Sequence, residues 1–581
     1  MRWRTGPVDT STFNRALAIV RASRVTQQCQ QDMTAHRGRK RSYAYEALFT
    51  VLQIAALEGF GELLLSDAAQ VVVRLTPAQR EVLGIERLWS YALIEQAVTE
   101  LSTAMKERID EGTGEVTDAR LGMGLAEFMT SLASDFIPPQ IAQTDAQAVD
   151  STDYEAHARR RSWKHLMKAD IPEDSLPELD ALQGDAPKNE PGWPLQGADG
   201  RHQHTVDPDA RDGYRAGKNR NRKGVFCGWD LHLSVDVPEI GGQARPGLIR
   251  GASLFPAGTY KAEGGLALID AMIAADRKPT TVLVDRGYTY LDTEQWARQV
   301  WSRGVEQVLD LHKNQRTRRP GPIPGTVFVD GGLFKDTLPA DLRTLGGYAL
   351  GMSAEAKALL AEQYDRRKYH AFTPMGAPNH ERGTQRYRDP VLSGTMRCAN
   401  HPKSMRLDPS RYPTTQCVRG TSCSCGTTVT LGPDDLLNLR QRLLYGTTKW
   451  KASYGRRSAV ESTNACVKTH HARLMRHSTR VRGTERNGIL LSFILAAVNA
   501  SLLLTRYGYD AGAPPQIAGD AVIGPLPQAR PTKALHRQRK FTRSRRAQAP
   551  PGSERTGPTT TPWVTVKRTA KSPGKRSVKT K

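Results

Sequence analysis

The chain has 581 residues, seven of them cysteine, and its 83 lysines and arginines against 59 acids give a formal net charge of +24. This length predicts roughly two to four domains, and the positive charge predicts a polyanionic partner, with DNA or RNA as the first candidates. Seven cysteines in a chain of this length do not indicate a secreted disulfide framework, and the N-terminus lacks the apolar segment of a signal peptide, so we expect a cytoplasmic protein.

The first 140 residues are expected to form an all-helical domain. Residues 42–65 and 88–109 both carry apolar side chains at helical spacing with few helix breakers. Between them, Thr76 directly before Pro77 predicts the start of another helix. No helix-turn-helix signature stands out, so DNA binding and plain packing remain alternative roles for this domain.

From residue 145 onward, strand-like and helix-like segments alternate. Residues 225–237 alternate apolar and polar side chains, which predicts a strand buried on one face. Asp292 and Gly304 mark the expected start and end of a helix. The order strand, two strands, helix, strand, helix, strand predicts an α/β fold in which helices pack on a mixed sheet. The other expected strands are 147–153, 247–255, 281–285 and 305–312, and the other helix is 264–276.

Residues 313–450 break this alternation with many glycines, prolines and turn residues, and we interpret them as a β-rich insertion. Four of the seven cysteines fall within this segment, with His401 nearby. Their irregular spacing leaves two alternatives, a structural Zn²⁺ site with thiolate ligands or reduced free thiols. The four are Cys398, Cys417, Cys423 and Cys425.

The C-terminal part combines an apolar helix with a basic tail. Residues 489–504 form an apolar run that is shorter than a membrane span and contains Asn499, so we predict a buried core helix and no membrane partner. Residues 509–581 are expected to be disordered, since positions 526–581 hold 16 lysines and arginines against one acid, Glu554. Such a tail would hold phosphate groups without sequence preference.

Four chemically distinct side chains share one predicted helix face between residues 454 and 468. On a helix that turns about 100° per residue, they fall within an arc of roughly 60°. The ordinary interpretation is an Arg–Glu pair at i,i+4 on a solvated surface. The functional interpretation is a site that needs a carboxylate and cations side by side. The four residues are Tyr454, Arg457, Glu461 and Lys468.

Two aspartates are placed at the ends of predicted strands, Asp150 in "AVDST" and Asp285 in "TVLVD". Side chains at strand ends can project into a shared site, and Mg²⁺ prefers carboxylate ligands. We hypothesise that Asp150, Asp285 and Glu461 converge on one or two Mg²⁺ (or Mn²⁺) ions, which would support in-line phosphoryl transfer. For each acid the alternative is a cap of the following turn, and Asp153 is the alternative first acid.

The ordered set of Asp150, Asp285 and a Tyr-x2-Arg-x3-Glu-x6-Lys segment resembles the DDE transposases of bacterial insertion sequences, specifically the group with a Y-R-E-K signature. The resemblance implies an RNase H-like catalytic core in two parts, residues 141–312 and 451–508, on either side of the insertion. The 175 residues between Asp285 and Glu461 fit that layout.

The resemblance also implies an activity, Mg²⁺-dependent cleavage at the ends of a mobile element and transfer of the freed 3′-hydroxyls to target DNA. It implies that Tyr454, Arg457 and Lys468 grip phosphates beside the scissile bond. The implied partners are double-stranded DNA, as terminal inverted repeats and target, and further copies of the chain in a dimer or synaptic complex on the bacterial nucleoid. The alternatives are a catalytically silent or host-adopted DNA-binding relative and an RNase H-like nuclease without transposition.

Further residues are candidates for DNA contact. Arg159 and Arg160 follow the first predicted strand and either place positive charge beside the site or form a solvated loop. Trp450, four residues before Tyr454, either stacks on an unpaired base or packs within the protein.

Overall fold

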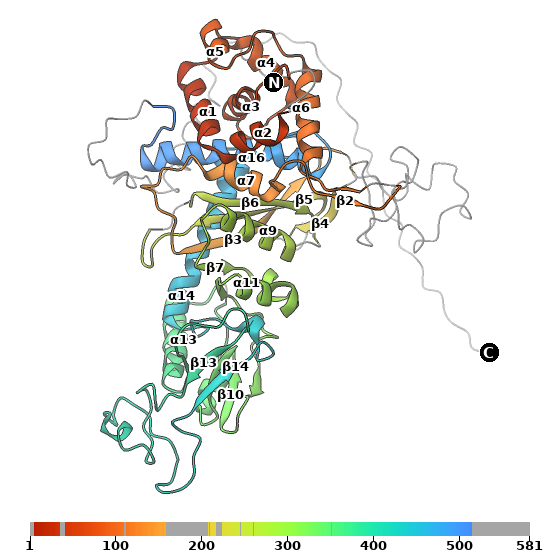
Figure 1. The fold of residues 1–581 in the computed structure, drawn as a ribbon. Helices are drawn as coiled ribbons and strands as arrows, with labels where there is room; N and C mark the ends of the chain where they lie inside the picture. The colour runs from red at the N-terminus through yellow and green to blue at the C-terminus, as the bar shows by residue number, and fades with distance from the viewer. Residues whose placement is uncertain are drawn as a thin grey trace, which may run out of the picture. The chain divides into compact units, whose positions relative to one another are not determined.

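The computed structural model (Figure 1) describes most of the chain between residues 5 and 513. The candidate DNA contacts Arg159 and Arg160 lie outside the described residues, as does the predicted basic tail beyond residue 513. The described ranges are 5–34, 41–109, 112–158, 207, 209–215, 224–243, 246–258, 261–349 and 351–513.

The N-terminal part of the chain is mainly helical, but it is not all-helical as predicted, because two short strands pair within residues 108–117. Helix α5 begins after Thr76, whose hydroxyl accepts from the Gln79 amide while the Gln79 side chain accepts from the Thr76 amide, so the predicted helix start is confirmed. Helix α3 is buried almost all round by its neighbours. The elements are α1 Thr10–Ala22, α2 Arg24–Met33, α3 Tyr45–Gly59, α4 Leu65–Arg74, α5 Pro77–Val82, α6 Tyr91–Ala104, β1 Arg108–Ile109, β2 Val116–Thr117 and α7 Leu125–Ser134.

A mixed six-stranded sheet follows these helices. Its strand order is β4-β5-β3-β7-β8, and β6 pairs with β5 on the same edge as β4. Strands β3 and β5 are antiparallel, whereas β7 and β8 run parallel to β3. The predicted mixed sheet is confirmed, and this arrangement fits an RNase H-like core. The strands are β3 Ala146–Glu155, β4 Arg211–Arg215, β5 Gly224–Asp236, β6 Ile249–Pro256, β7 Thr281–Val284 and β8 Glu306–Leu309.

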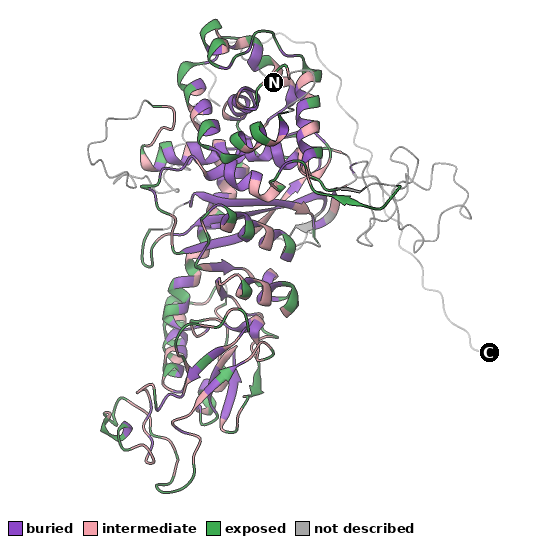
Figure 2. Cartoon of the chain, viewed as in Figure 1, coloured by how far each residue is buried: buried purple, intermediate pink, exposed green. Residues whose placement is uncertain are grey.

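Strand β5 is buried on both faces, which corrects the prediction of a half-buried strand. Three of its alternating polar residues, His232, Ser234 and Asp236, are buried. The His232 ring hydrogen-bonds to the Tyr288 hydroxyl (3.2 Å), and Asp236 forms a 2.7 Å ion pair with Arg250. Helix α9 (Lys261–Ala274) packs over β5 and β6. The helix therefore covers the face of β5 that the alternation predicted to be exposed to water. Figure 2 shows this burial across the sheet.

Short helical turns follow β7 and lead to β8. The Asp292 carboxylate accepts from the Glu294 amide and Gly304 adopts a φ of +66°, which confirms the predicted start and end of this helical segment. One turn of this segment is π-helical, so its backbone hydrogen bonds join residues five apart instead of four apart. The segment consists of α10 Arg286–Thr289, a π-helical turn Thr293–Ala297 and α11 Arg298–Ser302.

Helix α16 (Thr484–Leu502) and the π-helical turn after it are long and apolar enough to cross a membrane, but 78% of the apolar window is buried inside the protein. Both polar atoms of the Asn499 side chain form hydrogen bonds in this buried position. Its Nδ2 donates to the carbonyls of Ala133 and Ile249 (2.8 Å each), and its Oδ1 accepts from the Ile249 amide (2.9 Å). The predicted core helix is confirmed, and it joins α7 and β6 in one hydrophobic core.

Replacing Asn499 with leucine should destabilise this core. The change leaves one buried amide and two buried carbonyls without their partner, at about 1–3 kcal/mol for each stranded group. Urea unfolding should show the loss, whereas Asn314→Leu at an exposed position should shift the midpoint little. Equal midpoints for the two variants would contradict the structural role of Asn499.

The predicted insertion contains two small antiparallel sheets and separate small hydrophobic clusters. One sheet has the order β11-β10-β9, the other β12-β13-β14. A cluster around Val327, Phe334 and Leu342 supports the first sheet, and a cluster around Phe372, Tyr387 and Val429 lies between the two. The elements are β9 Arg318–Pro320, β10 Thr326–Val329, β11 Gly332–Lys335, α12 Ala340–Arg343, α13 Ala354–Arg366, β12 Thr373–Pro374, β13 Gln385–Arg388 and β14 Thr428–Leu431.

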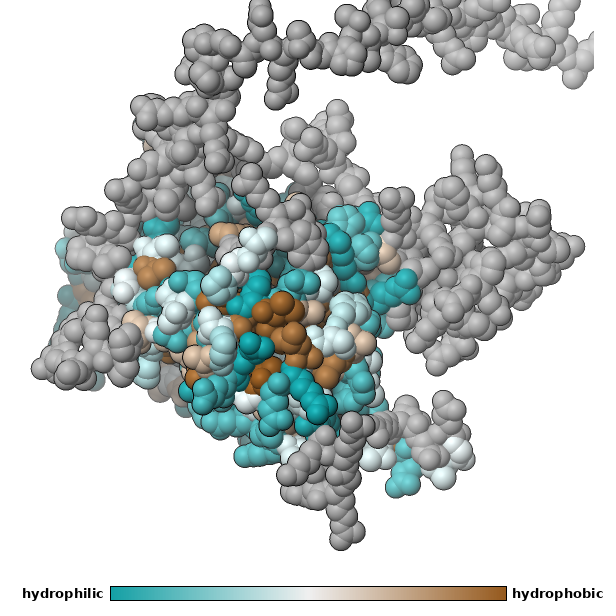
Figure 3. Space-filling view, turned by 90° about the horizontal axis from the view of Figure 1, so that it is seen from above, coloured by the Kyte–Doolittle hydropathy of each residue, from teal (hydrophilic) through white to brown (hydrophobic). Residues whose placement is uncertain are grey.

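Figure 3 looks down on the N-terminal helices, where a small group of hydrophobic side chains is surrounded by hydrophilic ones. Large exposed apolar residues of these helices include Val73, Val82 and Tyr91. Single exposed apolar side chains are normal on protein surfaces, and we assign no function to these residues.

Candidate active site

Three neighbouring parallel strands each carry an aspartate directly after the last residue that pairs with the neighbouring strand. Val149 of β3 pairs with Val284 of β7, and Val284 pairs with Leu309 of β8. Because parallel strands advance together, the residues that come next stand in one row across the sheet. These residues are Asp150, Asp285 and Asp310.

Asp150 lies in the middle of β3, which corrects the prediction that the strand ends there. Strand β3 continues to Glu155, whereas β7 pairs with it only as far as Val149. Beyond Val149, the edge of β3 that paired with β7 lies beside side chains from other elements. Asp285, the first residue after β7, stands opposite Asp150 where the paired edge stops.

In this row, the pKa of Asp150 is affected by burial and by the neighbouring Asp285 carboxylate. Burial, and after it the nearby Asp285 carboxylate, raise the pKa of Asp150 from its ordinary value of 3.8 to about 6. Lys261 and Arg457 act in the opposite direction. A partly buried pair of acids that repel each other is a place where a divalent cation is favoured.

The signature segment crosses this region as a series of short helical turns, so the prediction of one regular helix is wrong. A 3₁₀ turn holds fewer residues per turn than an α-helix and a π-helical turn holds more, so positions on the segment do not keep a constant angular step. Helix α15 packs against β3 and β5. The segment consists of α14 Thr448–Tyr454, a 3₁₀ turn Gly455–Arg457, α15 Ser458–Ala465 and a π-helical turn Cys466–His470.

The guanidinium of Arg457 stands between two of the three predicted acids. Its Nη1 lies 3.3 Å from Asp150 Oδ2, and its Nη2 lies 2.6 Å from Glu461 Oε1. The same guanidinium carbon lies 5.9 Å from the centre of the Tyr454 ring. The Glu461 side chain is 60% exposed, whereas those of Arg457 and Asp150 are 16% and 17% exposed. Three signature residues therefore meet beside Asp150.

Lys468, the fourth signature residue, contacts a different acid. Its Nζ lies 2.5 Å from Asp153 Oδ1. Side chains three residues apart on a strand project to opposite faces, so Asp153 does not share the face of Asp150. Asp150, not Asp153, is in register with Asp285.

Trp450 is packed within the protein. Its side chain is 4% exposed, and its indole Nε1 donates to the Leu309 carbonyl (3.0 Å). Its ring stacks on Tyr454 with centroids 5.0 Å apart and lies 4.6 Å from the Tyr445 ring. These contacts make Trp450 a packing residue in this structure, one of the two roles that the sequence left open, and they hold Tyr454 in place beside Arg457.

The sequence did not identify Lys261, the first residue of α9. Its Nζ lies 3.0 Å from Asp285 Oδ1 and 4.5 Å from the centre of the Tyr288 ring. Nothing in the surrounding sequence marks this lysine, because only the packing of α9 on the sheet brings it to the acids.

Asp310 was also missed, although a signal for it exists. The segment "VLD" that ends with Asp310 repeats the pattern of "LVD" that ends with Asp285. Asp310 accepts from the Tyr445 hydroxyl (3.2 Å) and forms a 2.7 Å ion pair with Arg286. These partners indicate a structural role at the far end of the row.

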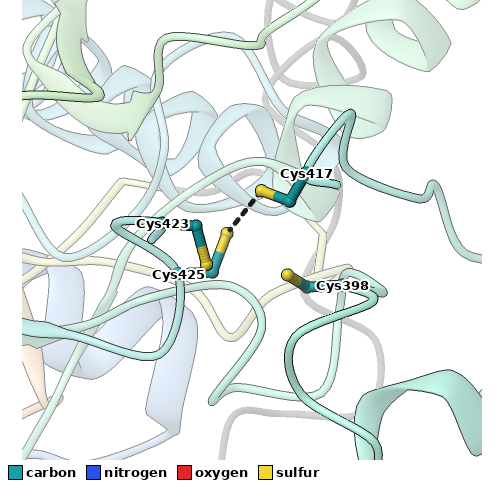
Figure 4. Close-up of side chains that lie close together, drawn as sticks. All are labelled: Cys398, Cys417, Cys423 and Cys425. Atoms are coloured by element: carbon teal, nitrogen blue, oxygen red, sulfur yellow. Dashed lines mark hydrogen bonds between the residues drawn. The ribbon is translucent and has the colours of Figure 1, made fainter. Parts of the chain in front are cut away.

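The four cysteines of the insertion are brought together by the fold. The thiols of Cys398, Cys417, Cys423 and Cys425 lie within 4.8 Å of one another (Figure 4), and all four are free. The His401 ring lies apart from the thiols and hydrogen-bonds to the Cys425 carbonyl (2.9 Å). In the described part of the chain no other group of three or more histidine, cysteine or acidic side chains is gathered as closely, the three candidate acids included.

The raised pKa of Asp150 makes the stability of the metal-free protein depend on pH. Folding favours the protonated carboxyl, so this contribution is fully present below about pH 4 and is lost as the pH rises through about 6. We expect the melting temperature in EDTA to fall between these pH values by more in the wild type than in Asp150→Asn. Parallel pH profiles for the two proteins would contradict the assignment.

One comparison with known proteins identifies the family. A family model described as the transposase DDE domain matches residues 142–500, which is more than half of the chain. No curated protein matches the chain, and no solved structure matches it. The matched range contains Asp150, Asp285 and Glu461 together with the whole six-stranded sheet and most of helix α16. The chain belongs to the DDE transposase family.

Proposed function

We propose that the chain is an active DNA transposase that cuts at the ends of its mobile element and joins the freed 3′-hydroxyls to target DNA. Family membership supports a transposase function in general. The observation that carries the finer proposal is the register that sets Asp150 beside Asp285, with Glu461 linked to Asp150 through Arg457.

Asp150, Asp285 and Glu461 would hold one or two Mg²⁺ (or Mn²⁺) ions. The residues fit such an ion, because they offer only carboxylate oxygens and because the repulsion between Asp150 and Asp285 would be relieved by a divalent cation. A bound ion would activate the attacking water or 3′-hydroxyl and stabilise the leaving oxygen. Glu461 is exposed enough to turn toward the two aspartates without unpacking the core.

Arg457, Tyr454 and Lys468 would position the DNA backbone. Arg457 now pairs with two carboxylates, and a phosphate group could take the place of one of them, because a guanidinium binds both oxyanions with the same paired donors. Lys468 supplies a second cation further along β3. In this proposal Arg159 and Arg160 add phosphate contacts, and the contacts fix the position of the strand rather than read its sequence.

The proposed partners are double-stranded DNA, as element ends and target, and a second copy of the chain in a dimer or larger synaptic complex. The same proposal places the protein in the bacterial cytoplasm, on the nucleoid. The competing function is a catalytically silent DNA-binding relative. Retention of all three acids beside an intact signature favours the active enzyme.

Excision from a plasmid that carries the gene with its native flanks tests the proposal. Wild type should excise the element, Glu461→Gln should bind the end DNA without excising it, and the exposed control Glu362→Gln should behave as wild type. Excision by Glu461→Gln at the wild-type level would show that Glu461 is not the third acid. DNA binding without excision by the wild type, on intact flanks, would favour the silent relative.

A further inference from the structure

The cysteine cluster of the insertion has the dimensions of a tetrathiolate metal site. Cys417 Sγ and Cys425 Sγ lie 3.7 Å apart. Sulfur atoms at the corners of a tetrahedron around zinc, with Zn–S distances of about 2.3 Å, would stand about 3.8 Å from one another. In Figure 4 the side chains of all four cysteines turn toward a common centre from three separate stretches of loop.

The part of the insertion around these thiols has little else to hold it together. Between β13 and β14 the one regular element is a 3₁₀ turn, Ser404–Arg406. The local hydrophobic cluster consists of Val391 and Met396 with Cys398 and Cys425, and the other two cysteines pack against it. A segment with so small a core needs a disulfide or a metal to order it.

Hydrogen bonds of one side chain join the loops that carry the cysteines. The Asn400 Nδ2 donates to the carbonyls of Val418 and Thr421, and its Oδ1 accepts from the Gly420 amide (2.8 Å). Asn400 lies two residues after the first cysteine of the cluster, and its three partners lie between the second and the third. This side chain therefore holds the stretches that carry these cysteines next to one another.

A buried lysine balances charge at the same place. Lys335 of β11 is 3% exposed and pairs with Asp389 at 2.8 Å. Its Nζ also donates to the carbonyl of Ser424, between two of the cysteines (3.0 Å). Four thiolates around a divalent ion carry a net charge of −2, so a cation held at the cluster is favourable. Lys335 thus ties the cysteine loops to the first small sheet.

We propose that Cys398, Cys417, Cys423 and Cys425 bind one zinc ion as four thiolates, and that this ion orders residues 389–427 of the insertion. A closed set of four sulfur ligands is typical of structural zinc rather than catalytic zinc. The site therefore serves folding, and it stands whether or not the chain is an active transposase.

Metal analysis of the purified full-length protein tests the proposal. We expect about one zinc per chain by plasma mass spectrometry in the wild type and in Cys29→Ala, which removes a buried free thiol of α2 far along the chain. Cys423→Ser should lose most of the zinc, because three sulfurs bind the ion much more weakly than four. Replacement of zinc by Co²⁺ should give the intense absorption of cobalt–thiolate bonds in the wild type.

Limited proteolysis separates loss of the ion from general unfolding. Removal of zinc by a chelator should open cleavage sites between residues 389 and 427, while α16 and the sheet remain protected. Iron in place of zinc, two disulfides among the four cysteines, or four thiols that titrate as free in a metal-free yet protease-resistant insertion would each overturn the proposal.

Discussion

Asp285→Asn is expected to reduce cleavage of element-end DNA by at least about 10²–10³-fold, the usual loss when one group that stabilises the transition-state charge is removed. Asparagine keeps the shape of the side chain and can still cap the following turn, where the carboxylate now accepts from the Gly287 amide (2.9 Å). It removes the negative charge that a divalent ion requires beside Asp150. The fold and DNA binding should therefore be retained.

The measurement is the initial rate of nicking of a labelled duplex that carries an element end, with binding of the same duplex followed by fluorescence anisotropy. Asp310→Asn is the matched control, since it makes the same change at the neighbouring position of the row. Because Asp310 is engaged by Arg286 and Tyr445, its loss should slow cleavage by no more than about tenfold. Equal losses in the two variants would contradict the separate roles given to them.

Arg250→Ala is expected to destabilise the six-stranded sheet by about 3–5 kcal/mol, the usual cost of breaking a buried ion pair from one side. Arg250 and Asp236 have side chains that are 5% and 9% exposed. The guanidinium also donates to the Ile141 carbonyl (2.7 Å). The change therefore leaves the buried Asp236 carboxylate without its countercharge and the carbonyl without this donor.

Urea unfolding of full-length protein should show this loss, and Arg298→Ala provides the control. Arg298 pairs with Glu294 on the surface, where the side chains are 38% and 62% exposed, and its removal should cost only about 0.3–0.5 kcal/mol. A double change, Arg250→Met with Asp236→Leu, should recover much of the lost stability, because no buried charge is left unpaired. No recovery would show that the hydrogen bonds, and not the charge, dominate.

Five of the six strands of the sheet were predictable because their signals are local, whereas β4 was not predicted. Runs such as "TVLVD" and the alternation around Trp229 are determined by side chains within a few residues of one another. The burial of His232 and Asp236 was not predictable, since it depends on α9 and Arg250, which come later in the chain. Alternation alone does not say whether water or a helix covers the polar face.

In the candidate site, likewise, residues marked by local sequence patterns could be predicted, whereas residues brought in by tertiary packing could not. The signature spacing marked Arg457 and Glu461, but only the register of β3, β7 and β8 shows which acids stand side by side. Lys261 and Asp310 enter the site through strand and helix packing. Spacing could not find Lys261, and Asp310 was missed although its strand ending repeats that of Asp285. The cysteines likewise have irregular spacing but converge in space.

Cleavage of the protein backbone by a bound Fe²⁺ ion tests most directly whether the three acids share one metal. Fe²⁺ replaces Mg²⁺ at oxygen ligands and, with peroxide, generates radicals that cut the chain next to the ion. With end DNA bound, we predict cuts adjacent to Asp150, Asp285 and Glu461 that excess Mg²⁺ suppresses and that Asp150→Asn abolishes. Cuts confined to other positions, or cuts at the three acids that persist in Asp150→Asn, would contradict a shared metal site.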